Sequence, residues 1–337
     1  MITHVRIQNF RSFLDAEVDL EPFSLVVGAN GSGKTNLLRF FEVVTSPPQH
    51  THARALQVLA VGLGEPCWKP HINHREEVAS FKIYFEDKPN WEGESLSGIF
   101  VPVVKRESNV LSGLNIKVFN LKAENISGVE AIGPDAVVGS TGTGTVQVLD
   151  MLKNGDREDL FDQIEASFKR YVPEVEKLSL KTVKEGFKQI QVREKGLKEP
   201  TPGPELSEGT RLILALLTII HQEKPPAIIL LEDIDRGMHP RLFEYIAPLM
   251  RDMAVQHGIN ILATTHNPYL VDAFQDNKKA VIIVEKKDGV STLTTLDKRL
   301  EGLNYEEINP DDMPLGALWY SGIVGGTPAK ISHKVEV

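Results

Sequence analysis

The chain has few of the features that mark secreted or membrane-spanning proteins. Its 337 residues include a single cysteine, Cys67, which excludes an intramolecular disulfide framework and agrees with a reducing compartment. No apolar run reaches the roughly 18 residues that a membrane-spanning helix needs, and the amino terminus has no signal-peptide pattern. We therefore expect a cytoplasmic protein with no membrane partner.

Basic residues are also fewer than acidic ones. The chain carries 46 acidic and 37 basic residues, a net charge of -9, whereas a protein that neutralises DNA phosphates usually has a basic balance or stripe. The basic residues between Lys169 and Lys198 are interleaved with acids, which is typical of a solvated surface. DNA binding by the monomer is therefore not supported, although a dimer groove or a partner chain remains able to provide it.

One motif is complete. Residues 28–35 read Gly-Ala-Asn-Gly-Ser-Gly-Lys-Thr, follow an apolar run at 23–27 and precede a helical pattern at 36–41. This order of strand, glycine-rich loop and helix is the context that a phosphate-binding loop requires. The structural alternative is a glycine-rich turn before a helix. It is disfavoured because all four required positions of the motif are filled and the flanking strand and helix patterns are present. The sequence therefore predicts binding of a nucleoside triphosphate.

Each position of this loop has a predicted role. Glycines let successive backbone N–H groups face the phosphates at the positive end of the following helix. Lys34 is expected to meet the β- and γ-phosphates, and Thr35 to ligate Mg²⁺. The expected cofactors are thus ATP and Mg²⁺. The loop residues assigned to the nucleotide are Asn30, Gly31, Ser32, Gly33, Lys34 and Thr35.

Around the motif, alternating patterns at 2–8 and 16–20 predict a strand pair that feeds the phosphate-loop strand. Residues 46–136 show short β-like runs between Pro, Gly and Asn breakers, which predicts an inserted antiparallel lobe; the runs lie at 80–85, 99–104 and 114–119. A helix is expected at 157–171, followed by strands at 177–184 and 187–193. Sustained heptads are absent, so a long coiled-coil insertion is excluded.

The last third alternates strands and helices. Apolar runs at 227–231, 259–263 and 280–284 predict buried parallel strands, with helical segments at 240–257 and 268–274 between them. Each helical segment begins with a proline, where a first turn tolerates one, and Asn267 is a candidate cap for the second. This pattern predicts an α/β core around the phosphate loop.

A second anion-binding element is predicted at 205–211, where Ser207 can cap the strongly apolar helix at 212–221. Gly209 would leave the amides at the helix start accessible to an anion. Such a helix start is common in proteins, so its functional interpretation depends on its position between the phosphate loop and the paired acids.

Two acids end the apolar strand at 228–231. A parallel strand delivers them to the sheet edge where ligands bind. We assign Glu232 to the metal shell through water, and Asp233 to orienting or deprotonating the attacking water. The next strand brings His266 to the same edge, where it is predicted to contact the γ-phosphate. A solvated strand end and a structural histidine are the alternatives.

The motif order resembles ATP-binding-cassette ATPases. The segments at 9–13, 28–35, 206–210, 232–240 and 264–268 together resemble the RecF/SMC-like branch, in particular small AAA-type ATPases similar to overcoming-lysogenisation-defect (OLD) proteins. The resemblance extends to the tail at 315–322 and Gly325-Gly326. It implies an α/β P-loop NTPase of the ABC type, with a parallel-sheet core, an antiparallel β lobe, a helical signature lobe and no coiled-coil insertion. It also places Arg11 at the nucleotide.

The resemblance implies one ABC-type ATPase domain over residues 1–337. Its P-loop core and signature helix would comprise 1–45 and 205–300, with an inserted β and helical lobe at 46–204 and a tail at 301–337. Two protomers would sandwich ATP, each phosphate loop facing Ser207 and Gly209 of the other. The chain carries no nuclease segment of the kind that some OLD proteins contain, so a nuclease-like effector is expected in trans, in DNA repair or anti-phage defence.

Two departures from the family pattern leave an alternative open. Asp233 is one methylene shorter than the usual catalytic glutamate, and the Q-loop glutamine has only weak candidates in Gln49 and Gln57. The alternative is a nucleotide-gated scaffold that binds ATP and holds a partner with negligible hydrolysis. A zinc site at Cys67, His71 and His74 lacks a fourth ligand and is disfavoured. Residues 139–144 resemble a dinucleotide turn but predict only a flexible loop.

Overall fold

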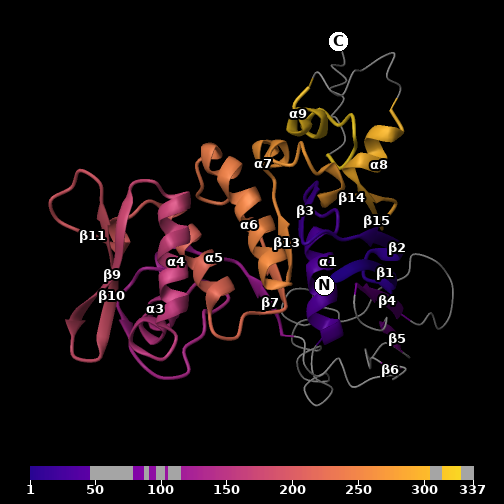
Figure 1. Ribbon diagram of the computed structural model, residues 1–337. Coiled ribbons are helices and arrows are strands. Elements are labelled where there is room, and N and C mark those ends of the chain that lie inside the picture. The colour runs from indigo at the N-terminus through magenta and orange to yellow at the C-terminus, as the bar shows by residue number, and fades with distance from the viewer. Residues whose placement is uncertain (46–78, 87–90, 96–102, 105–114, 304–312, 328–337) are drawn as a thin grey trace, which may run out of the picture. The chain divides into compact units, whose positions relative to one another are not determined.

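The computed structural model describes residues 1–45, 79–86, 91–95, 103–104, 115–303 and 313–327 (Figure 1). The chain falls into two compact units. Unit 1 comprises Met1–Ser112 and Thr264–Val337, and unit 2 comprises Gly113–Ala263. The predicted Q-loop candidates and the Cys67 cluster lie outside the described residues.

Unit 1 begins with an antiparallel sheet in the strand order β2-β1-β4-β5-β6. The expected strand pair is present, and its inward residues, such as Val5 and Ile7, are fully buried. The run predicted at 80–85 pairs with the first strand, as an antiparallel lobe requires. The strands are β1 (Ile2–Phe10), β2 (Phe13–Asp19), β4 (Ala79–Phe85), β5 (Trp91–Ser95) and β6 (Val103–Val104).

A second set of strands in unit 1 carries the phosphate loop. β3 (Phe23–Gly28) is buried along its whole length and pairs in parallel with β14 (Val281–Lys287). β14 in turn pairs antiparallel with β15 (Val290–Thr295). Burial on both faces of the sheet explains why the sequences of β3 and of the first part of β14 are continuous apolar runs. The helical segments of this unit are α1 (Lys34–Thr45), α7 (Pro268–Asp272), η5 (Lys278–Ala280), α8 (Leu296–Glu301) and α9 (Leu315–Tyr320).

Unit 2 contains three parallel strands in the order β13-β12-β7. β12 (Ile228–Leu231) and β13 (Asn260–Thr264) confirm two of the predicted buried strands. The helices of this unit are α3 (Thr145–Asn154), α4 (Glu158–Tyr171), α5 (Glu208–His221) and α6 (Phe243–His257), with 3-10 turns η2 (Ala123–Asn125), η3 (Gly203–Glu205) and η4 (Pro240–Leu242). In the described segments no coiled-coil insertion is present, and the mixed α/β class with a parallel-sheet core is confirmed.

The run at 114–119 was expected in the antiparallel lobe, and that expectation is wrong. β7 (Ile116–Phe119) pairs in parallel with β12, with Ile116 opposite Ile228 and Phe119 opposite Leu231. Parallel pairing joins segments about a hundred residues apart, so it leaves no signal in local periodicity. β7 therefore extends the sheet that carries the paired acids.

The antiparallel sheet of unit 2 is built on the predicted hairpin at 177–193. β9 (Val175–Lys184) and β10 (Phe187–Glu194) form the hairpin, which packs beside α4 and α3 (Figure 1). Two short strands, β8 (Glu130–Ala131) and β11 (Thr201–Pro202), extend it on β10. The hairpin was predictable because its pairing is local and its turn contains Gly186, at φ 71°.

The glycine-rich segment at 139–144 differs from the flexible loop that we expected. It forms a hydrogen-bonded turn, with Gly139 N donating to Thr143 O at 2.6 Å. The Glu130 carboxylate accepts from the backbone N–H groups of Gly144, Val146 and Gln147, so it already fills the start of α3. Burial raises the pKa of Glu130. This segment is therefore structural, because a side chain of the protein occupies the place of an external anion.

α5 is the central helix of unit 2. Every residue from Leu212 to His221 is buried, and the helix packs against α4 and α6. Its last residue, His221, stacks edge-on against His257 at the end of α6, with ring centroids 5.1 Å apart. Burial lowers the pKa of both imidazoles. Within the described ranges, no helix combines the length and apolar character that crossing a bilayer requires.

The histidine pair makes unit 2 sensitive to acid. The folded-state pKa values of both histidines lie below the ordinary value of about 6.5. The stability that the two neutral imidazoles contribute to the fold is therefore fully present above that pH and is lost as the pH falls below it. We expect His257→Phe, which keeps a ring beside His221 and removes one titrating group, to weaken this loss. The unfolding midpoint measured by circular dichroism between pH 7.5 and 5 tests it; equal acid sensitivity of variant and wild type would contradict the assignment.

Candidate functional site

The phosphate loop leaves β3 at a point where only glycine fits. Gly28 has φ 156°, and a Cβ on it would lie 2.4 Å from the backbone oxygen of Val284 on β14. Gly33, at φ 119°, would place a Cβ 2.7 Å from Ser291 Oγ on β15. Gly31 has φ 74° and open space around it. Two glycines are therefore fixed by close packing, and the third by the turn of the backbone.

Lys34 and Ser32 are the buried polar side chains of this loop. Lys34 is 7% exposed, and its ammonium donates to the backbone oxygens of Gly28, at 2.7 Å, and Ala29, at 3.0 Å. Ser32 is 3% exposed, and its Oγ has no hydrogen-bond partner among the described residues. A buried hydroxyl without a partner carries a desolvation cost that an incoming acceptor oxygen can offset. The loop is therefore suited to an anionic ligand.

The other loop side chains are accessible. Asn30 and Thr35 are exposed, and Thr35 lies in the first turn of α1. The loop is held from behind, since the Ser291 hydroxyl donates to the backbone oxygen of Ser32 at 2.5 Å. The exposed Thr35, beside a loop held by this hydrogen bond, fits the predicted role in metal binding.

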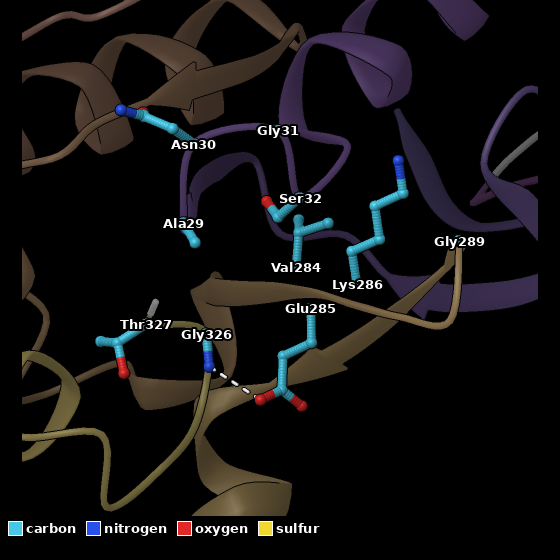
Figure 2. A pocket seen from close by; sticks show the side chains of 10 residues that line it. All are labelled: Ala29, Asn30, Gly31, Ser32, Val284, Glu285, Lys286, Gly289, Gly326 and Thr327. Carbon is cyan, nitrogen blue, oxygen red and sulfur yellow. Dashed lines mark hydrogen bonds between the residues drawn. The ribbon is translucent and has the colours of Figure 1, made fainter. Parts of the chain in front are cut away.

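A cavity of about 410 Å³ opens on one flank of the loop (Figure 2). One wall is formed by loop residues and the other by the end of β14 and a glycine-rich segment near residue 326. Its polar lining includes the unpartnered Ser32 and the exposed ammonium of Lys286. The lining residues are Ala29, Asn30, Gly31, Ser32, Val284, Glu285, Lys286, Gly289, Gly326 and Thr327.

Arg11 lies in the turn between β1 and β2, beside the start of α1. It has φ 52°, and its guanidinium donates to Asn36 Oδ1 at 3.0 Å. The Asn36 amide in turn donates to Ser12 Oγ at 2.9 Å. Burial, with the nearby charge of Arg39, lowers the pKa of Arg11. The turn is therefore tied to the helix that follows the phosphate loop, as a nucleotide contact from Arg11 requires.

His266 follows the end of β13 and is exposed. The preceding residue, Thr265, is fully buried, and its backbone N–H donates to the Val26 oxygen of β3 at 3.2 Å. Asn267 caps α7 by accepting from Tyr269 N at 3.0 Å, as predicted from the sequence. His266 is thus held in unit 1, next to the strand that leads into the phosphate loop.

In unit 2 the paired acids follow β12. The Glu232 backbone N–H donates to Phe119 O at 2.9 Å, and its carboxylate accepts from Asn120 Nδ2 at 3.3 Å. Asp233 is exposed and has φ 48°, in the left-handed region that few residues other than glycine adopt. The acids therefore differ in environment: Glu232 is half-buried and braced by β7, whereas Asp233 projects from a turn.

Ser207 is the N-cap of α5. Its Oγ accepts from Thr210 N at 3.1 Å, and the side chain is exposed. Gly209 is buried, and a Cβ there would lie 2.6 Å from Leu242 Cδ1. A side chain at position 209 would therefore displace the end of the Leu242 side chain, a contact that the sequence did not indicate. Glu208 also approaches the turn after the acids, where a Cβ on Gly237 would lie 2.3 Å from its Oε2.

The described geometry thus groups the predicted residues within each unit. Unit 1 brings Arg11 and the phosphate loop together and holds His266 beside β3, and unit 2 packs the start of α5 on the turn after the acids. Within the described ranges, no group of three His, Cys, Asp or Glu residues has metal-binding geometry. Mg²⁺ at nucleotide sites uses only one or two protein ligands plus phosphate oxygens and water, and the Thr35 hydroxyl and the Glu232 carboxylate each offer the kind of oxygen that it prefers.

Several residues of the site were not found from the sequence. Asn120 braces Glu232, Ser291 holds the loop, and Glu285 and Lys286 line the cavity. All of them reach the site through tertiary pairing of distant segments. The only sequence signal was weak, namely that polar residues follow the apolar strands at 116–119 and 281–284.

Two family models match the chain. One, described as "AAA ATPase domain", matches residues 1–127, and the other, described as "AAA domain, putative AbiEii toxin, Type IV TA system", matches residues 146–272. No curated protein matches the chain significantly.

Solved structures with a similar fold include heads of SMC proteins. An SmcHead bound to the C-winged helix domain of ScpA has a TM-score of 0.57 at 16% identity, over 89% of this chain and 99% of that one. The Pyrococcus furiosus head bound to the C-terminal domain of ScpA gives 0.51 at 15%, covering 89% and 98%. The Thermotoga maritima SMC head domain gives 0.50 at 14%, covering 87% and 98%. Two family models of the AAA type thus match successive parts of the chain, which contains a complete phosphate loop, and its fold is similar to that of SMC head domains.

Proposed function

We propose that the protein is a Mg-ATP-binding and hydrolysing switch that dimerises around ATP. The observation that carries this proposal is the phosphate loop, in which Lys34 is buried beside an unpartnered Ser32 hydroxyl and a polar cavity. A buried hydroxyl with no hydrogen-bond partner among the described residues carries a desolvation cost that an acceptor oxygen of an anion can offset. AAA family models and the SMC-like fold support the same ligand class.

In this proposal each residue has one task. Lys34 binds the β- and γ-phosphate oxygens, the loop amides of residues 30–33 orient them, and Thr35 and Glu232 hold Mg²⁺. When bound, Mg²⁺ would offset negative charge on the phosphates. Asp233 orients or deprotonates the attacking water. His266 contacts the γ-phosphate, and Arg11 holds the nucleotide at the turn before β2.

Dimerisation would follow from the second anion-binding helix start. Ser207 is exposed at the N-terminus of α5, where the helix dipole favours negative charge. Ser207 and Gly209 would thus serve the nucleotide of the other protomer, and two helix starts around one triphosphate would share its charge. Loss of the γ-phosphate on hydrolysis would let the protomers separate.

We further propose that the switch acts with a partner protein in DNA repair or anti-phage defence. Two of the SMC heads above are bound to domains of ScpA, so this fold accommodates a partner chain. The type IV TA description of one family model fits a defence role. The effector would be nuclease-like and supplied in trans, in the cytoplasm. The net charge of -9 does not support DNA binding by the protomer itself.

The second candidate function is a nucleotide-gated scaffold with negligible hydrolysis. It is favoured by Asp233, whose carboxylate is one methylene shorter than that of glutamate and projects from a left-handed turn residue. A general base must come within hydrogen-bond distance of the water that it activates. A scaffold would bind ATP and a partner even if the Asp233 carboxylate could not reach the attacking water.

ATP binding is expected to depend on Lys34. Lys34→Ala removes charge-assisted hydrogen bonds to phosphate, so the Kd for Mg-ATP measured by calorimetry should rise by more than about tenfold. Lys198→Ala removes an exposed cation in unit 2 and should bind as wild type does. Unchanged affinity in the Lys34 variant, with an unchanged unfolding midpoint, would rule out this loop as the nucleotide site.

Turnover should depend on Asp233 more than binding does. Asp233→Asn keeps a side chain that tolerates φ 48° and removes the base, so phosphate release should fall by about a hundredfold or more while ATP stays bound. Wild-type protein that binds Mg-ATP but releases no phosphate, alone or with its co-purifying partner, would favour the scaffold over the enzyme.

The position of Ser207 gives a test of the dimer. Ser207→Arg should leave ATP binding by the monomer nearly intact and block ATP-dependent dimerisation and hydrolysis, because the new side chain clashes with the opposing nucleotide site. Ser207→Thr, which retains a capping hydroxyl, is the matched control and should dimerise. Light scattering after chromatography, with phosphate release, measures both.

Mixing two variants tests which protomer supplies Ser207. In a heterodimer of Ser207→Arg with Lys34→Ala, one composite site carries both lesions and the other carries neither. Dimerisation and hydrolysis should therefore partly recover in the mixture. A Ser207→Arg protein that dimerises and hydrolyses ATP like wild type would remove the signature role and leave only the phosphate-loop assignment.

A further inference from the structure

Residues 315–327 of unit 1 form a segment that we name the glycine clasp. It begins with α9, which packs closely on α7: the Gly316 N–H donates to Asp272 Oδ1 at 2.7 Å, and a Cβ on Gly316 would lie 2.1 Å from Pro268 O. α7 starts two residues after His266. The clasp is therefore built directly on the segment that is predicted to sense the γ-phosphate.

Three glycines turn the clasp back onto β14. Gly322, Gly325 and Gly326 have φ angles of 83°, 82° and 74°, which side chains with a Cβ rarely adopt. A Cβ on Gly325 would lie 2.2 Å from Glu285 Oε1, and one on Gly326 would lie 2.6 Å from Ile283 Cγ2. The segment thus lies against β14, the strand that pairs with β3.

Glu285 anchors the clasp at the end of β14. Its Oε1 accepts from the Gly326 backbone N–H at 2.8 Å (Figure 2). Its other oxygen accepts from the Arg299 guanidinium of α8. A carboxylate held between a backbone amide and a guanidinium makes charge-assisted hydrogen bonds, which are stronger than neutral ones. Glu285 therefore ties the glycine turn of the clasp to β14, in addition to the packing of α9 on α7.

The docked clasp faces the phosphate loop. Gly326 and Thr327 line the cavity of about 410 Å³ opposite Asn30 and Ser32 (Figure 2). The buried Ser32 hydroxyl without a partner points to a ligand with acceptor oxygens in this cavity, and Lys286 adds a positive charge to its rim. The cavity exists only while the clasp is docked, since the clasp forms one of its walls.

We propose that the glycine clasp is the second wall of the nucleotide pocket, so that a nucleotide triphosphate in the phosphate loop and the docked clasp stabilise each other. This proposal rests on the proposed ATP site. A ligand that contacts the clasp only in its docked position must shift the clasp toward that position, and docking must raise ligand affinity by the same factor. Glu285 is then a positioning residue, acting on nucleotide affinity through the Gly326 backbone.

Hydrogen–deuterium exchange of the full-length wild-type protein tests the coupling directly. Mg-ATP should slow amide exchange in residues 322–327, and the same addition to Lys34→Ala should leave that exchange unchanged. Glu285→Ala should raise the Kd for ATP by at least about fivefold, the low end of typical coupling between sites. Glu301→Ala, which removes an exposed carboxylate from α8, is the matched control and should bind ATP like wild type.

The outcomes separate the two proposals. ATP binding that depends on Lys34, with clasp exchange unaffected by ATP and full affinity in Glu285→Ala, would overturn the clasp role and leave the ATP site standing. Absence of ATP binding by wild type would overturn both. The wild-type exchange measurement requires no variant, so a Glu285→Ala protein that fails to fold still leaves the inference open to refutation.

Discussion

The phosphate loop depends on one constraint: β3 is buried along its whole length, and the chain must turn sharply where it ends. At Gly28 the oxygen of Val284 occupies the space that a side chain would need, so the turn can begin only with glycine. The backbone oxygens of Gly28 and Ala29 then face the Lys34 ammonium, which satisfies them and fixes its own position. Strand burial, the turn and the cation are thus consequences of the same packing against β14.

This arrangement is organised for a ligand more than for stability. The Ser32 hydroxyl is buried without a partner, and Gly33 is fixed against Ser291, which also holds the loop backbone. The unpartnered hydroxyl costs folding free energy, whereas the Ser291 hydrogen bond holds the loop and reduces the rearrangement needed when an anion binds. The segment at 139–144 shows the opposite solution, since there the Glu130 carboxylate fills the helix start permanently. Comparing the two helix starts distinguishes a binding loop from a structural turn.

The sequence predicted what depends on local patterns. The phosphate-loop strand and helix, the Ser207 and Asn267 caps and the β9–β10 hairpin are specified by residues close together in the chain. Pairing between distant segments was not predictable, which is why β7 was placed in the wrong sheet and why Asn120 was missed as the partner of Glu232. Gly325 and Gly326 were noticed in the tail, but their contact with Glu285 appears only in three dimensions.

The aspartate at 233 can be understood from the backbone that carries it. At φ 48° a residue with a long side chain is disfavoured, whereas Asp and Asn are the residues other than glycine that tolerate this region best. The turn is closed by the Arg236 N–H, which donates to Asp233 O at 3.0 Å, and it continues into Gly237, which approaches Glu208 of α5. The shorter acid therefore suits the tight turn that follows β12 and approaches Glu208 in the first turn of α5. A longer carboxylate at this position would gain reach toward water at the expense of that turn.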